Sequence, residues 1–245
     1  MKRNRAPVGS AALLAGLLAL ATPGPSRADD FVVYSPYVTQ GQTEFEIRGA
    51  QQYDSDPAVS GTRSVEISVA HAFTDWWRPE VYLGEYKRVP GQGGQWIGNE
   101  FENVFQLAPQ GKYWADPGFV LSYEQKRQPG VPSALEFGPL FERQSGRINQ
   151  RLNLIWEKEV GAGASGKFAG RAAYAFAYNI SRAVAPGFEL YLRPSDNSYQ
   201  IGPILRGELA SSHGTELEYR IGMVFGLNAA APDQTFLAHI EYEFY

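Results

Sequence analysis

The sequence predicts an all-β fold: a transmembrane, antiparallel, up-and-down barrel of about twelve strands, with ten or fourteen as alternatives. Apolar and polar residues alternate with a period of two in segment after segment, which gives a sheet one apolar and one polar face. These segments run about nine to twelve residues, the length that a tilted strand needs to cross a bilayer. Their number is even, as in single-chain bacterial barrels.

Twelve segments show this pattern, and nearly every gap between them holds Gly, Pro, Asn, Asp or Ser, the residues that turns select. In the second segment, for example, Val65 and Ile67 share the apolar parity while Glu66 lies on the opposite one. We expect strands near residues 43–53, 63–73, 77–87, 99–107, 118–127, 134–143, 147–158, 167–178, 187–193, 199–209, 215–225 and 235–245.

A soluble β-sandwich is the alternative, because it shows the same alternation with its apolar face turned inward. The segments are longer than the usual five or six residues of soluble strands. Trp76, Trp77, Trp96 and Trp114 fall at predicted strand ends or in connections, where interfacial aromatic residues belong. Both features favour the membrane.

Residues 1–28 have the composition of a secretory signal peptide. Three basic residues precede the apolar run of residues 11–21, and Ser26 and Ala28 place small side chains at the −3 and −1 positions of a cleavage site. The alternative, a membrane anchor, needs a run of about 20 residues. We therefore expect an exported chain that begins at Asp29, with residues 29–245 forming the barrel domain.

Charge and cysteine content narrow the function classes. Removing the signal peptide lowers the count of basic residues from 22 to 18 and leaves the 26 acidic residues, so the remaining chain has a net charge of −8. Such a surface repels nucleic acid, which is bound through basic patches. The chain has no cysteine, so no disulfide framework supports it.

The last residues carry a family resemblance. Residues 240–245, Ile-Glu-Tyr-Glu-Phe-Tyr, resemble the terminal strand of outer-membrane β-barrel proteins of diderm bacteria, the porin-like superfamily, with one extra residue after Phe244. The resemblance implies an outer-membrane location, contact with outer-membrane lipid, and recognition of the terminal aromatic residue by the barrel-assembly machinery. It identifies an architecture and no closer family, and the oligomeric state stays open.

With both ends in the periplasm, alternate connections face outward: 54–62, 88–98, 128–133, 159–166, 194–198 and 226–234. The longest is the Gly-rich stretch 88–98. None exceeds about a dozen residues, so we expect no long folded-in plug.

The polar parity is the candidate functional surface. It carries sixteen glutamates and eight arginines in the predicted strands. Either these charges pair into a closed network, or they line a narrow aqueous path of net negative potential that favours cations. The lumen-lining residues that we expect are Glu46, Arg48, Glu66, Glu100, Glu102, Arg151, Arg171, Arg206, Glu216, Glu218, Arg220 and Glu241.

Three other patterns are weaker. Residues 161–167 match a phosphate-loop pattern except at Phe168, but a strand pattern follows where a helix is needed, so we expect a hairpin loop. Ser211 and Ser212 adjoin His213 in a predicted turn, and His71 follows the lipid-facing parity. Neither arrangement resembles a catalytic triad.

His239, Glu241 and Glu243 share the lumen-facing parity of the last strand and offer metal-binding groups. Successive residues on one face lie about 6.5–7 Å apart along a strand, too far for three of them to bind one ion. We expect a polar wall paired with arginines.

The first functional hypothesis is therefore a passive channel for small polar solutes or cations, with no catalytic residues, metal or cofactor. The second is a structural envelope barrel with a closed, salt-bridged lumen. The third is an outer-membrane lipid hydrolase. Fold alone does not decide among them.

Overall fold

A computed structural model describes residues 31–212 and 214–245, and the predicted signal peptide with its cleavage site lies outside them. Within the described part, no helix is long and apolar enough to span a bilayer. A short 3-10 helix, η2 (Pro194–Asp196), joins β9 to β10. The strands are β1 (Thr43–Tyr53), β2 (Arg63–His71), β3 (Trp77–Val89), β4 (Gly93–Gln106), β5 (Asp116–Lys126), β6 (Ser133–Ser145), β7 (Ile148–Val160), β8 (Phe168–Tyr178), β9 (Ala185–Arg193), β10 (Ser198–Ser212), β11 (Thr215–Gly226) and β12 (Gln234–Phe244).

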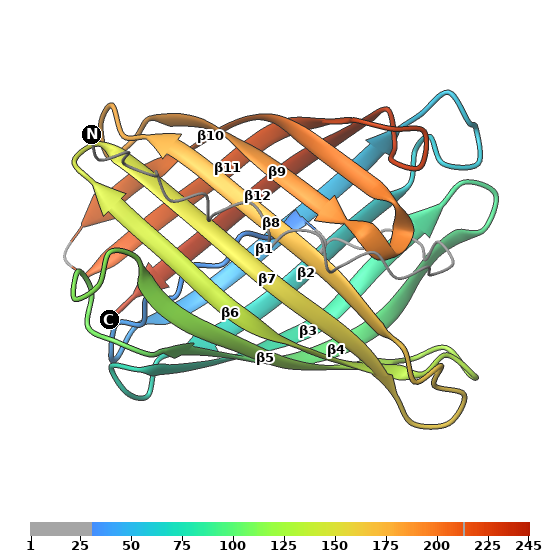
Figure 1. The fold of residues 1–245 in the computed structure, drawn as a ribbon, viewed down its shortest axis with the longest axis horizontal. Coiled ribbons are helices and arrows are strands. Elements are labelled where there is room, and N and C mark those ends of the chain that lie inside the picture. The colour runs from blue at the N-terminus through green and yellow to red at the C-terminus, as the bar shows by residue number, and fades with distance from the viewer. Residues whose placement is uncertain (1–30, 213) are drawn as a thin grey trace, which may run out of the picture.

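The twelve strands form one closed, antiparallel barrel in which each strand pairs with its neighbours in the chain (Figure 1). The ring closes where β1 meets β12, with Thr43 opposite Phe244 and Tyr53 opposite Gln234. Closure leaves no free sheet edge. A barrel in lipid requires this, because no water is present there to satisfy the backbone groups of an edge strand. The predicted fold class and strand number are confirmed.

The two parities lie on opposite faces of the barrel wall. On β1, Phe45 and Ile47 point outward and are 48% and 55% exposed, whereas Glu44 and Arg48 are buried inside. A soluble sandwich would show the reverse. The exposed apolar residues cover the outer face on strand after strand, so burial of this face requires lipid.

One predicted connection is wrong. The Gly-rich stretch 88–98 was expected as the longest outer loop, but β3 continues to Val89 and β4 starts at Gly93. Gly91 and Gly93 take positive φ angles of 78° and 76°, which lets the chain reverse in a tight turn. The glycines belong to the turn of an extended hairpin.

A bulge in β3 also breaks the simple alternation. The pairing with β4 shifts between Tyr82 and Glu85, and the side chains of Glu85 and Lys87 are buried inside the barrel. A bulge adds one residue to a strand and reverses the parity beyond it. Parity counted from Trp77 therefore missed both of these inward charges.

The barrel also contains a short inserted segment, which the connections between the strands did not predict. Residues 31–42 precede β1 and cross the lumen, and we call them the lumen segment. At one end, Phe31 and Val33 pack against inward-facing residues of β1, β8, β9, β11 and β12. Further along, Tyr34 and Val38 pack against Val104, Leu140 and other apolar residues of β4 to β7. The segment therefore bridges two walls of the barrel.

Polar contacts fix the lumen segment to one wall. The amide of Asn153 on β7 accepts from the Tyr34 backbone N–H (2.6 Å) and donates to the Tyr34 carbonyl (3.1 Å). Farther along, Tyr37 Oη donates to Asp116 on β5 (2.8 Å), and the Val38 N–H donates to Gln106 on β4 (2.8 Å). Burial and the bond to Asp116 raise the pKa of the Tyr37 phenol, so it remains a donor.

Close approach to the wall requires a glycine. A Cβ atom added at Gly118 on β5 would lie 2.5 Å from the Pro36 Cβ atom. Any larger residue there would push the lumen segment away. Gly118 thus leaves room in the barrel wall for Pro36 of the lumen segment.

We expect Ile221→Arg to destabilise the barrel by about 2–4 kcal/mol, because Ile221 lies mid-strand on the lipid face and a charge there enters the membrane core. Leu107→Arg, one residue beyond the end of β4, is the control and should cost about 0–1 kcal/mol. The free energy of unfolding in lipid vesicles measures both. Equal values would contradict the assigned depth of Ile221.

We expect Asn153→Leu to release the lumen segment, because it leaves two buried Tyr34 backbone groups unpaired at about 1–3 kcal/mol each. Hydrogen exchange at residues 31–38 should accelerate while the strand amides keep their protection. Asn228→Ala, in the connection between β11 and β12, should leave the segment protected. Unchanged exchange in Asn153→Leu would show that the apolar contacts alone hold the segment.

Candidate functional site

The lumen holds one substantial cavity within the described part of the chain, with a volume of about 420 Å³. It lies between the lumen segment and the opposite wall of the barrel. Eight glutamates, six arginines and one histidine line it. The charged lining residues are Glu44, Glu46, Arg48, Arg78, Glu80, Arg151, Arg182, Glu189, Arg206, Glu208, Glu218, Arg220, His239, Glu241 and Glu243.

Strand register arranges the acidic residues into belts across neighbouring strands. Glu241 on β12 is directly opposite Glu46 on β1 and Glu218 on β11, and Glu218 is opposite Glu208 on β10. A second row, two residues nearer the chain termini, joins Glu44, Glu243 and Glu216 in the same way. Like charges directly opposite each other are destabilising, so these belts oppose folding unless cations offset them.

A basic belt follows on the other side of the first acidic belt. His239 is opposite both Arg48 and Arg220, and Arg220 is opposite Arg206. Successive rows lie about 6.5–7 Å apart along the strands. On these strands, acidic and basic rows therefore follow one another along the lumen axis.

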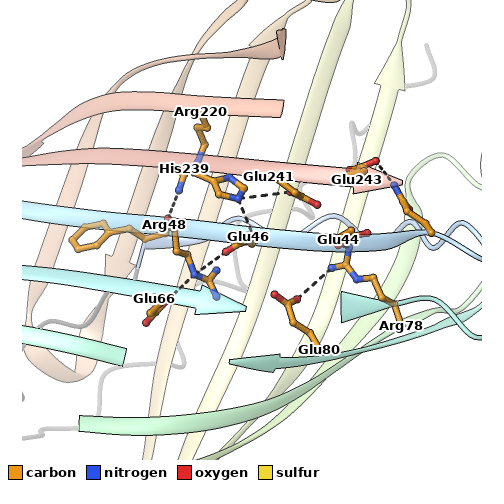
Figure 2. A network of polar contacts seen from close by, with 12 residues as sticks. Glu44, Glu46, Arg48, Glu66, Arg78, Glu80, Arg220, His239, Glu241 and Glu243 are labelled. Carbon is orange, nitrogen blue, oxygen red and sulfur yellow. Dashed lines mark hydrogen bonds and ion pairs between the residues drawn. The ribbon is translucent and has the colours of Figure 1, made fainter. Parts of the chain in front are cut away.

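Several of these charges pair. Arg48 Nε lies 2.6 Å from Glu66 Oε2 and 3.1 Å from Glu46 Oε1, and its guanidinium stacks over the Tyr82 ring at 4.6 Å. Arg78 Nη1 lies 2.6 Å from Glu44 Oε2. Figure 2 shows Arg48 between Glu46 and Glu66, and Arg78 between Glu44 and Glu80. Such buried pairs neutralise part of the wall and hold its side chains in place.

The end of the lumen segment takes part in the wall network. Arg220 donates from Nη2 to the Phe31 carbonyl (2.8 Å) and pairs through Nη1 with Glu189 Oε2 (2.5 Å). Tyr191 also donates to the Phe31 carbonyl (3.1 Å). The Phe31 carbonyl of the lumen segment therefore accepts from the Arg220 guanidinium, a donor that would otherwise face the cavity.

Glu218 and Arg206 are two charged side chains that face the cavity. The Glu218 side chain is exposed although it lies on the inner face, so it meets the water of the lumen. Arg206 donates to the Asn149 amide oxygen (2.6 Å). Both side chains line the cavity.

The sequence-predicted lining residues separate into groups. Glu46, Arg48, Arg151, Arg206, Glu218, Arg220 and Glu241 line the main cavity, and Glu66 and Glu100 line a much smaller space beside Tyr82. Glu102 is buried in the wall, Arg171 donates to Glu136 at 2.6 Å, and Glu216 belongs to the second acidic row with Glu44 and Glu243. A role for them in permeation stays a prediction.

Sequence reasoning missed the polar residues that hold the lumen segment, such as Asn153, Tyr191 and Asp116. The sequence does contain an indication that a segment packs inside the barrel. Val104 and Val120 lie on the polar parity and pair in register, so an apolar patch faces inward where only charge was expected. Such a patch indicates that something apolar packs against it.

Residues 161–167 connect β7 to β8, and Gly161, Gly163 and Gly166 there take positive φ angles, as in a loop. His71 Nδ1 lies 2.8 Å from Thr43 Oγ1. His213 and the side chains of Ser211 and Ser212 lie outside the described part.

No protein-family model matches the chain, and no curated protein matches it significantly. Solved structures do. An outer membrane channel from Pseudomonas putida F1 is 11% identical with a TM-score of 0.57, and the match covers 87% of this chain and 99% of that one. The NanC porin is 10% identical with a TM-score of 0.51, covering 82% and 99%. At these identities the likeness establishes the fold: this chain has the barrel architecture of outer-membrane channels and porins.

Proposed function

We propose that this protein is a passive channel for small cations and small polar solutes in the outer membrane of a diderm bacterium. The observation that carries the proposal is the charged cavity between the lumen segment and the wall of β1, β3 and β7 to β12. A solute would pass along this cavity, with the segment on one side and the acidic and basic belts on the other.

The barrel size supports a permeation path. A barrel of eight strands is filled by its own side chains, whereas a larger one encloses a cavity or channel. Here twelve strands enclose both an inserted segment and a polar cavity of about 420 Å³. The path is narrow, because the lumen segment takes up part of the cross-section, so only small solutes fit.

The charge of the lining supports a preference for cations. Eight glutamates outnumber six arginines around the cavity. Two acidic belts lie toward the end of the barrel where β1 starts and β12 ends. Acidic rings raise the local concentration of cations. The basic belt of Arg48, Arg220 and Arg206 opposes this effect, so we expect a moderate preference.

The outer-membrane location rests on the terminal strand, the lipid-facing surface and the printed description of similar structures as outer membrane channels and porins. We further propose that outer-membrane lipid surrounds the apolar face. The barrel-assembly machinery is the expected partner during insertion, through the strand that ends at Phe244.

Planar-bilayer recordings in a salt gradient test the proposal. Reversal potentials should favour cations, and the preference should weaken as ionic strength rises and screens the belts. Glu216→Gln with Glu218→Gln should reduce the preference, because both residues belong to the acidic belts. Asp75→Asn is the matched control, since this exposed carboxylate lies in the turn before β3. It should leave the preference unchanged.

A preference for anions would contradict the charge argument. The absence of conductance in a correctly folded barrel would contradict the channel and support the closed, salt-bridged barrel. The ion pairs of Arg48 and Arg78 would then belong to a structural network.

The lumen segment should limit the conductance. We expect Asn153→Leu, which frees the segment from β7, to raise the single-channel conductance or its fluctuations above those of the unmodified barrel. Asn228→Ala should behave as the unmodified protein does. Identical recordings from all three would place the conduction path away from the segment.

A further inference from the structure

We propose that Glu46, His239 and Glu241 form a binding site for a first-row divalent transition-metal ion such as Zn²⁺ in the lumen wall. The site is independent of conductance, since it needs only the folded barrel. It joins two neighbouring strands, β1 and β12, at the seam where the barrel closes.

The geometry fits one ion. His239 Nε2 lies 3.2 Å from Glu46 Oε2 and 3.7 Å from Glu241 Oε2, and the three ligand atoms lie within 4.8 Å of one another. Ligands about 2.0–2.1 Å from a tetrahedral Zn²⁺ ion lie about 3.4 Å apart. The two shorter separations fall on either side of that value. Figure 2 shows the His239 ring pointing between the two carboxylates.

Strand pairing brings the three ligands together. Glu46 is directly opposite Glu241, and His239 is diagonal to Glu46 on the same face. Diagonal neighbours on paired strands are within reach of long side chains. Spacing along β12 alone argued against a metal site at His239, Glu241 and Glu243. The neighbouring strand supplies Glu46 in place of Glu243.

The Nε2 atom of His239 faces the carboxylates of Glu46 and Glu241. It is shielded from solvent and has no hydrogen-bond partner of good geometry in the part of the chain that the structure describes. A shielded nitrogen without such a partner is uncommon in folded proteins. Imidazole with carboxylates suits zinc and related transition ions, whereas calcium and magnesium prefer oxygen ligands alone. The donor set therefore selects the class of ion.

The local charge points to the same ligand. Glu44 and Glu243 flank the site on the same strands, and Gln42 and Arg78 contact them. Among the described residues, Glu241 makes its ion pair with His239 and none with an arginine. A divalent cation would offset the repulsion between the opposed carboxylates of Glu46 and Glu241.

Arg48 orients one of the ligands. Its Nε atom lies 3.1 Å from Glu46 Oε1, which leaves Oε2 facing His239, and Glu66 holds Arg48 from the other side. Ligating carboxylates in metal sites are commonly held in this way by a second layer of polar groups. Arg48 is a positioning residue and binds no metal.

The cavity provides access. Glu46, His239 and Glu241 all line it, so an ion can reach the three ligand atoms from the lumen. The competing interpretation is a protonated His239 bridging two carboxylates without any metal. Metal binding separates the two directly.

Isothermal titration of the folded barrel in detergent with Zn²⁺, after treatment with a chelator, tests the site. One ion should bind per chain. His239→Gln and Glu241→Gln should each weaken binding by about tenfold or more, as loss of a metal-site group does. His71→Gln, the matched control, removes a histidine that contacts Thr43 instead of carboxylates and should bind as the unmodified protein does.

Co²⁺ gives a second readout. Ligation by His239 should produce visible absorption bands of low-coordinate Co²⁺ that His239→Gln lacks and His71→Gln keeps. Heat-modifiable gel mobility verifies that each variant is folded. Absence of stoichiometric binding would overturn the proposal. Equal Zn²⁺ affinity in all variants would overturn it too, because binding would then be due to other carboxylates. Neither result depends on whether the barrel conducts.

Discussion

The pairing of β1 with β12 is the constraint on which the rest of the structure depends. Every backbone N–H and C=O group of a lipid-facing strand needs a partner within the protein, and only a closed ring provides one for all twelve strands. Closure in this register also sets which side chains meet inside. It places Glu46 opposite Glu241 and Arg48 opposite His239, so the charge belts follow from the backbone ladder.

Period-two alternation was sufficient for the architecture, because the physics that sorts the two faces acts residue by residue. Apolar side chains such as Phe45 and Ile47 must meet lipid, and the next residue then has to face inward. The prediction of β1 at residues 43–53 is confirmed. Alternation fails where backbone geometry changes without a change of composition, as at the bulge before Glu85.

The site was less predictable, since it depends on register between strands and on a segment without periodicity. Parity places His239 and Glu241 on the inner face but does not say which residue of β1 lies beside them. The lumen segment carries no strand pattern, and its partner Asn153 looks like one more polar inward residue. The paired Val104 and Val120 were the sequence's own indication of an apolar occupant.

The position of the lumen segment constrains the order of assembly. Its contacts join residues very far apart in the chain, such as Phe31 with Arg220 and Tyr34 with Asn153. These partners lie on walls that face each other only after the sheet has curled, and the contact with β11 requires nearly the whole chain. Loop closure over such separations is slow. The segment therefore settles after the ring has formed, and its burial reports a completed barrel.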